Sequence, residues 1–522
     1  MFRRTLFILM LLVASAPFAA AQTNSAITGV VVDETGLVLP GVTVEASSPA
    51  LIEKVRSVVS DGGGQYRIVD LSPGVYTVTF SLPGFSTVKR EGIELAGSFT
   101  ASINGEMRVG AQEETITVTG EAPVVDVQGV ARQRVLSNDT IEAVPTGRNY
   151  TNLGVLIPGV STQCAQTCGT GSQDVGGSSG DSRSTLTVHG SRFRDQRIAI
   201  NGMTIAGSTG GLTMSGPNME AMQEVAIETT SGDASTSTGG VRINVVPKDG
   251  GNTFGGSLFV TGTNENFQGE TLPQELKDRN LPANGVPRLK SLYDIAPTFG
   301  GPIKKDKIWF FLAARYSSNK TYVGGLFANK NAYDPTKWLY EPDTSKQITH
   351  DSPLHPVGAR FTWQATPRNK IAASLDLRDR CDCPNTIGGG SAVEATSDFI
   401  FRPDNIQMIS WSSPVTNRLL LQGTFVALPL GWGNRINSNI DPSLTPVTLQ
   451  NAPANTPTAY RSLNGFNWTN YPFWNIGFNA TYVTGAHAFK AGFSDNWGYA
   501  HTHWTSPGGP IANIRINATT GL

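Results

Sequence analysis

The second half of the chain alternates apolar and polar side chains with a period of two residues, and this pattern restricts the fold more than any other feature. It is clearest over residues 357–364, 371–378 and 489–497. Successive side chains of a strand point to opposite faces, so each segment would have one apolar and one polar face. Strands of about ten residues with this division are what a lipid-facing β-barrel needs. A strand of a soluble β-sandwich shows the same period, so alternation alone leaves both folds open.

The connections between these segments favour the barrel. Tight turns alternate with long polar connections, as in barrels that have short turns on one side of the membrane and long loops on the other. A soluble domain seldom holds several long structureless loops. The tight turns are expected at residues 302–307, 367–370, 414–417 and 484–487, and the long loops near 264–290, 319–353, 381–403 and 429–470. The tryptophans expected in a girdle at the membrane interface are Trp309, Trp363, Trp411 and Trp497.

The overall composition argues against two classes of protein. The formal net charge is −1 and charged residues make up 16% of the chain, which gives no electrostatic basis for binding nucleic acid. After the N-terminal segment the sequence has no run of about 18 apolar residues, the length that a membrane-spanning helix requires. We therefore predict an all-β-dominated chain that neither binds nucleic acid nor crosses a membrane with helices.

Residues 1–21 have the order of a secretory signal peptide. Arg3 and Arg4 come first, residues 6–13 form an apolar core, and the small residues 19–21 provide a cleavage site. The apolar run is too short to span a bilayer. We expect the mature chain to be exported to a compartment in which disulfides persist.

The cysteines are predicted to form disulfides in loops rather than metal sites. They are Cys164, Cys168, Cys381 and Cys383, and four cysteines allow three connectivities, among which the sequence does not decide. Neither close pair has the neighbouring histidines or cysteines that would complete a zinc site. No nucleophile–base motif stands out either. We therefore expect no metal, no cofactor and no enzymatic activity.

Residues 22–107 are predicted to form a small antiparallel β-sandwich of about seven strands. Short apolar or alternating runs are separated by turn residues such as Pro40-Gly41, Pro73-Gly74 and Pro83-Gly84. The order Gly36-x-x-x-Pro40-Gly41-Val42, then Ser60-Asp61-Gly62 and Tyr66, then Leu71-x-Pro73-Gly74-x-Tyr76 resembles the carboxypeptidase regulatory-like domain. That resemblance implies a carbohydrate-binding-like fold. It allows either sugar binding or a purely structural role.

Residues 108–136 contain a short β-prone run between acidic and turn residues. Such a strand can add to the edge of a partner's sheet through main-chain hydrogen bonds. The run resembles the TonB box, by which outer-membrane receptors contact a TonB-type energy-transducing protein. The matching residues are Glu114, Thr115, Ile116, Thr117, Val118 and Thr119. A last strand of the sandwich, or a linker, fits the same residues.

Residues 137–250 contain several motifs in one order. A short capped helix is expected at residues 138–145, followed by an Asn-Gly turn, a helix–strand element over residues 219–228 and a Gly-Gly-x-x-x-Asn-x-x-x-Lys stretch. This order resembles the plug of TonB-dependent receptors, particularly the Oar-like group, and implies a small α+β plug domain. The motif residues are Asn201, Gly202, Gly239, Gly240, Asn244 and Lys248.

Charged residues of the same segment suggest how a plug could be held. Arg192, Arg194 and Arg197, together with Glu224 and Glu228, could form ion pairs that face a wet lumen. A solvated ion pair is individually weak, often below about 1 kcal/mol, so a pull could release it. We expect a gating role for the group, and a simple solvated surface is the alternative.

Residues 251–522 would then be the N-terminal part of an antiparallel transmembrane barrel. The stretch from Gly300 to Phe311 resembles the first hairpin of the Oar-like barrel. About nine strands can be counted, whereas plugged transporters use about 22, and an open sheet edge is costly in lipid. We therefore expect a truncated barrel. Residues 238–259 would connect the last plug strand to the first barrel strand.

Together these patterns predict an outer-membrane TonB-dependent receptor. It would take up an unidentified small solute, oligosaccharide or peptide, with outer-membrane lipid and a TonB-type protein as its partners. A secreted or surface-attached carbohydrate-binding adhesion protein is the alternative.

Overall fold

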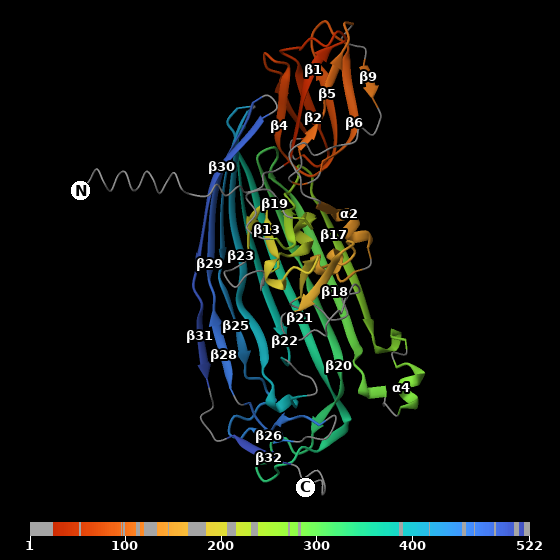
Figure 1. Ribbon diagram of the computed structural model, residues 1–522, viewed down its shortest axis with the longest axis vertical. Coiled ribbons are helices and arrows are strands. Elements are labelled where there is room, and N and C mark those ends of the chain that lie inside the picture. The colour runs from red at the N-terminus through yellow and green to blue at the C-terminus, as the bar shows by residue number, and fades with distance from the viewer. Residues whose placement is uncertain are drawn as a thin grey trace, which may run out of the picture.

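Three units follow one another along the long axis of the computed structural model: a β-sandwich, a curved sheet that holds a smaller domain against its inner face, and a group of loops at the opposite end (Figure 1). The residues described are 25–51, 54–95, 97, 100–110, 115–118, 133–144, 146–164, 184–205, 216–230, 239–269, 272–279, 283–385, 390–416, 418–450, 456–463, 465–484, 487–505 and 511–515. The predicted signal peptide, residues 1–21, lies outside them.

The N-terminal unit is a two-sheet sandwich, as predicted. Its core joins both sheets, and the rings of Tyr66 and Phe80 meet edge to face with centroids 5.6 Å apart. The antiparallel prediction is wrong for two strands, because β7 and β8 run parallel to β1. Strand β9, which comes after the residues predicted to form the sandwich, runs parallel to β6. Period-two patterning says nothing about strand direction. One sheet contains β1 (Ser25–Asp33), β4 (Gln65–Leu71), β7 (Thr100–Ser102) and β8 (Gly105–Met107), and the other has the order β3 (Val55–Val59), β2 (Thr43–Ser47), β5 (Gly74–Ser81), β6 (Thr87–Leu95), β9 (Thr115–Val118).

The plug domain is a five-stranded mixed sheet with short helices. Its order is β10 (Gln133–Ser137), β15 (Met222–Glu228), β16 (Arg242–Pro247), β13 (Arg197–Ile200), β14 (Met203–Thr204). A separate hairpin pairs β11 (Val160–Cys164) with β12 (Ser184–Val188), and the helical turns are α2 (Asn138–Ala143), α3 (Tyr150–Gly154), η1 (Phe193–Asp195) and η2 (Met219–Ala221). The predicted helix is confirmed, and the Ser137 side chain caps α2 by accepting from Thr140 N–H. No helix within the described ranges is long and apolar enough to cross a membrane.

The curved sheet is antiparallel and wraps around the plug. Its nine positions follow the chain order along the main path. Two neighbouring strands share one of these positions, because β19 and β20 both pair with β18 and β21 and are separated only by Arg315. The strands of the main path are β17 (Gly255–Asn264), β18 (Arg288–Lys304), β19 (Ile308–Ala314) with β20 (Tyr316–Asn329), β21 (Pro342–Thr366), β22 (Asn369–Asp382), β23 (Asp398–Pro414), β24 (Leu419–Leu428), β29 (Phe473–Thr484) and β30 (His487–Gly498).

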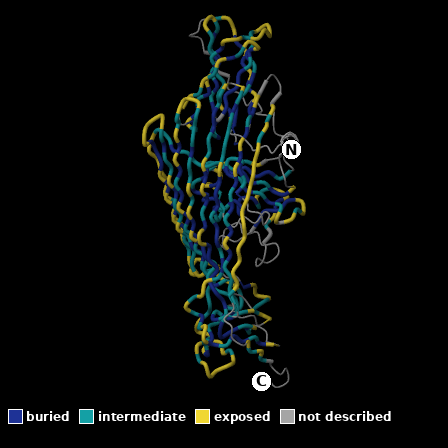
Figure 2. The backbone as a smooth tube through the Cα atoms, turned by 90° about the vertical axis from the view of Figure 1, so that its left-hand side faces the viewer, coloured by how far each residue is buried: buried dark blue, intermediate teal, exposed yellow. Residues whose placement is uncertain are grey.

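The two faces of this sheet differ as the alternation predicts. On β21, Val357 and Phe361 are 55% and 50% exposed on the outer face, whereas Arg360 and Thr362 are buried on the inner face. The backbone drawn by burial shows the buried positions gathered on the inner side (Figure 2). One girdle prediction is wrong: Trp309 is only 2% exposed and donates from Nε1 to Asn252 Oδ1. Its place in the alternation, paired with buried Thr362, puts it on the inner face.

The tight turns fall where the sequence places them, but much of the predicted loop structure is strand. β20 and β21 continue the sheet through most of residues 319–353, because the backbones of these polar residues still pair with each other. Residues 429–470 likewise contain short strands. These, and other elements at the same end, are β25 (Leu430–Arg435), β26 (Val447–Gln450), β27 (Ala459–Tyr460), β28 (Phe466–Asn470), β31 (His501–Thr505), β32 (Ala512–Arg515), α4 (Gln274–Asp278), η3 (Glu265–Phe267), η4 (Ala283–Gly285) and η5 (Val393–Ala395).

Candidate functional site: the plug and its contacts

The segment between β16 and β17 is fixed to the wall by one carboxylate. Asp249 accepts hydrogen bonds from Arg360 Nε at 2.7 Å, Thr362 Oγ1 at 2.8 Å and Lys370 Nζ at 3.0 Å. The donors stand on the inner faces of β21 and β22. Burial alone would raise the pKa of Asp249, but Lys370 and Arg360 outweigh it and hold that pKa far below its ordinary value. Asp249 is therefore a charged anchor at ordinary pH.

The residues after Asp249 leave no room for movement at this point. A Cβ on Gly250 would lie 2.4 Å from the carbonyl oxygen of Phe310, so a glycine is required for the chain to approach β19 this closely. Asn252 then accepts at Oδ1 from both Asp306 N–H and Trp309 Nε1, each at 2.8 Å. The predicted connection between plug and barrel is thus a rigid tether.

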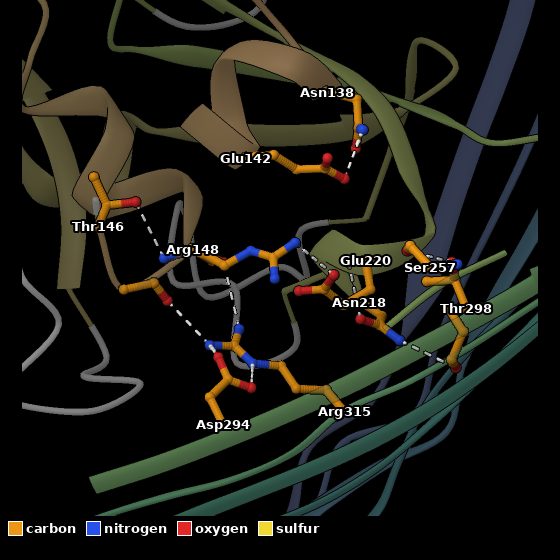
Figure 3. Close-up of polar contacts among 12 residues, drawn as sticks. Asn138, Glu142, Thr146, Arg148, Asn218, Glu220, Ser257, Asp294, Thr298 and Arg315 are labelled. Atoms are coloured by element: carbon orange, nitrogen blue, oxygen red, sulfur yellow. Dashed lines mark hydrogen bonds and ion pairs between the residues drawn. The ribbon is translucent and has the colours of Figure 1, made fainter. Parts of the chain in front are cut away.

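A second anchor joins the start of the plug to the other side of the sheet. Arg148 donates from Nη2 to Glu220 Oε2 within the plug at 2.8 Å, and both side chains are buried (Figure 3). The Arg148 guanidinium also lies 4.1 Å from the centroid of the Phe259 ring on β17, and this contact joins the plug to the wall. Burial raises the pKa of Glu220, and the neighbouring Arg148 works against that rise.

Arg315 ties the same corner to the wall. Its guanidinium makes two hydrogen bonds to Asp294, at 2.9 and 2.7 Å, and also donates to the carbonyl oxygens of Gly147 and Arg148 (Figure 3). The residue that separates β19 from β20 therefore reaches across to the plug. A cavity of about 470 Å³ lies beside it, lined by residues that include Arg148, Phe259 and Asn319.

Apolar contact holds the plug to a different part of the wall. The core of the plug continues without interruption into Ile406 and Met408 of β23, Val426 of β24 and Phe473 of β29. Packing is close, because a Cβ on Gly477 would lie 2.3 Å from Met203 Cε. The plug is thus packed by apolar contacts against β23, β24 and β29 and by charged contacts against β17 to β22.

The predicted plug motif comes together around one turn. Asn201 and Gly202 have φ of 49° and 77°, and Gly202 N–H donates to Asn244 Oδ1 at 2.8 Å. Gly240 is needed because its Cβ would lie 2.6 Å from the Asp195 backbone, whereas Gly239 faces open space. Lys248 N–H donates to the carbonyl oxygen of Ala221, and its ammonium lies 5.8 Å from the Phe311 ring centroid.

Each of the two glutamates has a described partner outside the group of three arginines. Glu228 pairs with Arg242 at 2.9 Å. Glu224, which is 3% exposed, accepts a hydrogen bond at Oε1 from the backbone N–H of Gly97 in the sandwich, at 2.6 Å. Burial raises the pKa of Glu224 to about 7, with the Gly97 N–H working against that rise.

The three arginines make local contacts around η1. Arg192 N–H donates to Asp195 Oδ2, and Arg197 Nη1 donates to the carbonyl oxygens of Arg194 and Gln196. These contacts hold the chain before β13 in shape. The gating role expected for Arg192, Arg194 and Arg197 remains a prediction.

The TonB-box-like run is placed as a strand of the sandwich. Thr115, Ile116, Thr117 and Val118 form β9 and pair in parallel with residues 87–90 of β6, at the edge of the sheet. Glu114 and Thr119 lie outside the described residues. In this structure the run is therefore a last strand of the sandwich, as the alternative interpretation expects. Its role as a TonB box remains a prediction.

Of the predicted disulfides, one is described. Cys381 and Cys383 are bonded to each other beside Asp398. Cys164 ends β11, and Cys168 lies outside the described ranges.

Comparison with known proteins agrees with this arrangement. Residues 26–108 match the carboxypeptidase regulatory-like domain family. Over 328 residues, 60% of this chain, the sequence is 30% identical to the TonB-dependent transporter Oar of Myxococcus xanthus. Over these residues the chain is homologous to this TonB-dependent transporter. It spans 28% of the length of Oar.

The fold of this Oar-like chain is also that of a solved transporter. The outer membrane transporter YddB from Escherichia coli superposes with a TM-score of 0.51 at 12% identity, covering 74% of this chain and 50% of YddB. This likeness confirms the predicted plug-and-barrel fold.

The sequence does not mark several of these contact residues. Asp249 lies in the stretch 238–259, which is expected only to connect the plug and the barrel, and no motif includes Gly97, Glu220, Asp294 or Arg315. For Asp249, the sequence offers one signal that could have pointed to the contact: charged residues next to two glycines, in Lys248-Asp249-Gly250-Gly251. The others depend on contacts between residues more than 20 positions apart.

Proposed function

We propose that this chain is part of an outer-membrane transporter that takes up a solute with energy supplied by a TonB-type protein. The observation that carries the proposal is the plug seated on the polar inner face of a sheet whose outer face is apolar. Asp249 and Arg148 anchor the plug to that inner face. A domain held by such anchors blocks the lumen until it is rearranged. The homology to Oar supports the same function.

The orientation follows from the connections. The tight turns lie at the sandwich end, where Arg418 in the turn before β24 contacts Asp61 of the sandwich. Barrels of this kind have their short turns in the periplasm and their long loops outside. The sandwich and plug therefore face the periplasm, where a TonB-type protein can reach β9. The protein lies in the outer membrane, and the extended loops at the other end capture the solute.

The substrate is a small solute, oligosaccharide or peptide, and the described residues do not favour one of these. Sugar binding by the sandwich remains a prediction. A secreted adhesion protein is the weaker hypothesis. It does not explain why the apolar side chains of Val357, Phe361 and Trp363 are exposed in a row on the outer face of the sheet.

Fractionation together with a binding assay tests the proposal. The protein is expected in the outer-membrane fraction and is expected to be captured by the purified periplasmic domain of a TonB-type protein. Ile116→Pro, in the middle of β9, should abolish capture because proline cannot donate to a ladder. Ile116→Val is the matched control and should be captured normally. A soluble protein, or capture unaffected by Ile116→Pro, would overturn the proposal.

A further inference from the structure

Sandwich, plug and wall meet around one polar cavity. Its volume is about 140 Å³, which is room for several water molecules. The sandwich contributes residues such as Ser72 and Gly97, the plug contributes Gln223 and Asn244, and the wall contributes Thr424. The cavity lies at the sandwich end of the lumen, beside the Asp249 anchor. The sandwich therefore covers a space that lies between plug and wall.

The contact between sandwich and plug is narrow and specific. Gly97 N–H donates to Glu224 Oε1, and a Cβ on Gly97 would lie 2.4 Å from that oxygen and 3.0 Å from Val246 Cγ2. A larger residue at this position would force the Glu224 carboxylate to move away from the Gly97 N–H. Because Glu224 belongs to β15, next to the central strand β16, this bond joins the sandwich directly to the plug sheet.

Two further contacts seat the sandwich on the rim of the sheet. Asp61 pairs with Arg418, and Ala26 and Val69 pack on Leu420. Both contacts lie on β24 or in the turn before it, and β24 also lines the cavity. The sandwich thus rests on the plug at one point and on the rim at another.

The TonB-box-like strand is connected to this contact by a short path. β9 pairs with β6, and Gly97 comes two residues after β6 ends at Leu95. A force that displaces β9 is passed to β6 and, through Gly97, to Glu224. The sandwich contact is thus loaded whenever β9 is pulled away from β6.

We propose that the sandwich is a lid over the cavity, latched to the plug by the Gly97–Glu224 hydrogen bond and released when displacement of β9 is passed along β6. The lid keeps the space between plug and wall closed while the protein is at rest. This inference rests on the proposed function for the source of the pull. The lid and its latch can be measured without transport.

The test measures access to the cavity in the purified protein and in membrane vesicles. Thr424→Cys places a thiol in the cavity wall, and a bulky charged maleimide reports whether it is covered. Labelling is expected to be slow in the parent chain and at least about tenfold faster with Gly97→Val, which corresponds to about 1.4 kcal/mol. Gly62→Ala, in open space of the same domain, is the matched control and should label slowly.

Changes at Glu224 separate a latch from a folding defect. Glu224→Gln keeps an oxygen for the Gly97 N–H and should keep the cavity closed, whereas Glu224→Ala removes it and should open the cavity. Equal labelling of all variants would overturn the lid, even if the protein is a TonB-dependent transporter. A soluble protein that still shows the latch-dependent labelling would overturn the proposed function and leave the lid standing.

Discussion

The plug has two interfaces of different character, one with the wall and one with the sandwich. The wall holds it through buried charged groups around Asp249 and Arg148 and through a continuous apolar core. The sandwich holds it through the hydrogen bond between Gly97 and Glu224. A pull applied through the sandwich therefore meets its weaker contact first. The difference indicates that uncovering the plug and moving it are separate events.

The largest expected effect comes from the wall. Asp249→Ala leaves Arg360 and Lys370 buried without their shared carboxylate, and breaking a buried ion pair in this way costs about 3–5 kcal/mol. The free energy of plug unfolding in urea, followed by hydrogen exchange at β16 amides, should fall by that amount. Asp334→Ala, in an exposed turn, is the control and should leave the value unchanged. A value within 1 kcal/mol of the parent chain would show that this anchor is not structural.

The sandwich contact is expected to depend on pH. The pKa of Glu224 is raised to about 7 when docked, so the docked state binds more protons than an undocked state with an ordinary pKa. Docking is therefore strongest at low pH and weakens as pH rises from about 4.5 to about 7, by at most about 3 kcal/mol. Distances between spin labels on the sandwich and the rim should report this change. Glu224→Gln should remove the pH dependence, and an unchanged dependence would assign it to another group.

The smallest effect is expected within the apolar part of the wall contact. Gly477→Ala places a Cβ against Met203 Cε, and overpacking of this kind costs about 1–2 kcal/mol. The same urea measurement should detect it. Gly423→Ala, on the neighbouring β24, meets only ordinary contacts and is the control. The double variant Gly477→Ala/Met203→Ala should lose less unfolding free energy than the sum of the two single losses, because Met203→Ala removes the atom that the new Cβ would meet. Losses that add exactly would contradict a direct contact between the two residues.

Features that depend only on residues close together in the chain could be predicted from the sequence. The left-handed turn at Asn201-Gly202, the capped helix α2 and the alternation on β21 were each predictable from neighbouring residues. Prediction failed where backbone pairing or distant contacts decide. Polar residues of 319–353 continue as strand because their backbones pair. Trp309 faces inward because its register on β19 places it opposite the buried Thr362, where its Nε1 donates to Asn252. No pattern in residues 90–100 indicates that Gly97 meets Glu224, 127 positions away.

The length of β21 has a consequence for where a solute first meets the protein. Its 25 residues, at about 3.3 Å each and a tilt of about 40°, rise roughly 60 Å along the axis of the sheet. The hydrocarbon layer of a bilayer is only about 30 Å thick. The long paired strands therefore extend well beyond the hydrocarbon layer. A diffusing solute touches ordered protein long before it reaches the depth of the membrane.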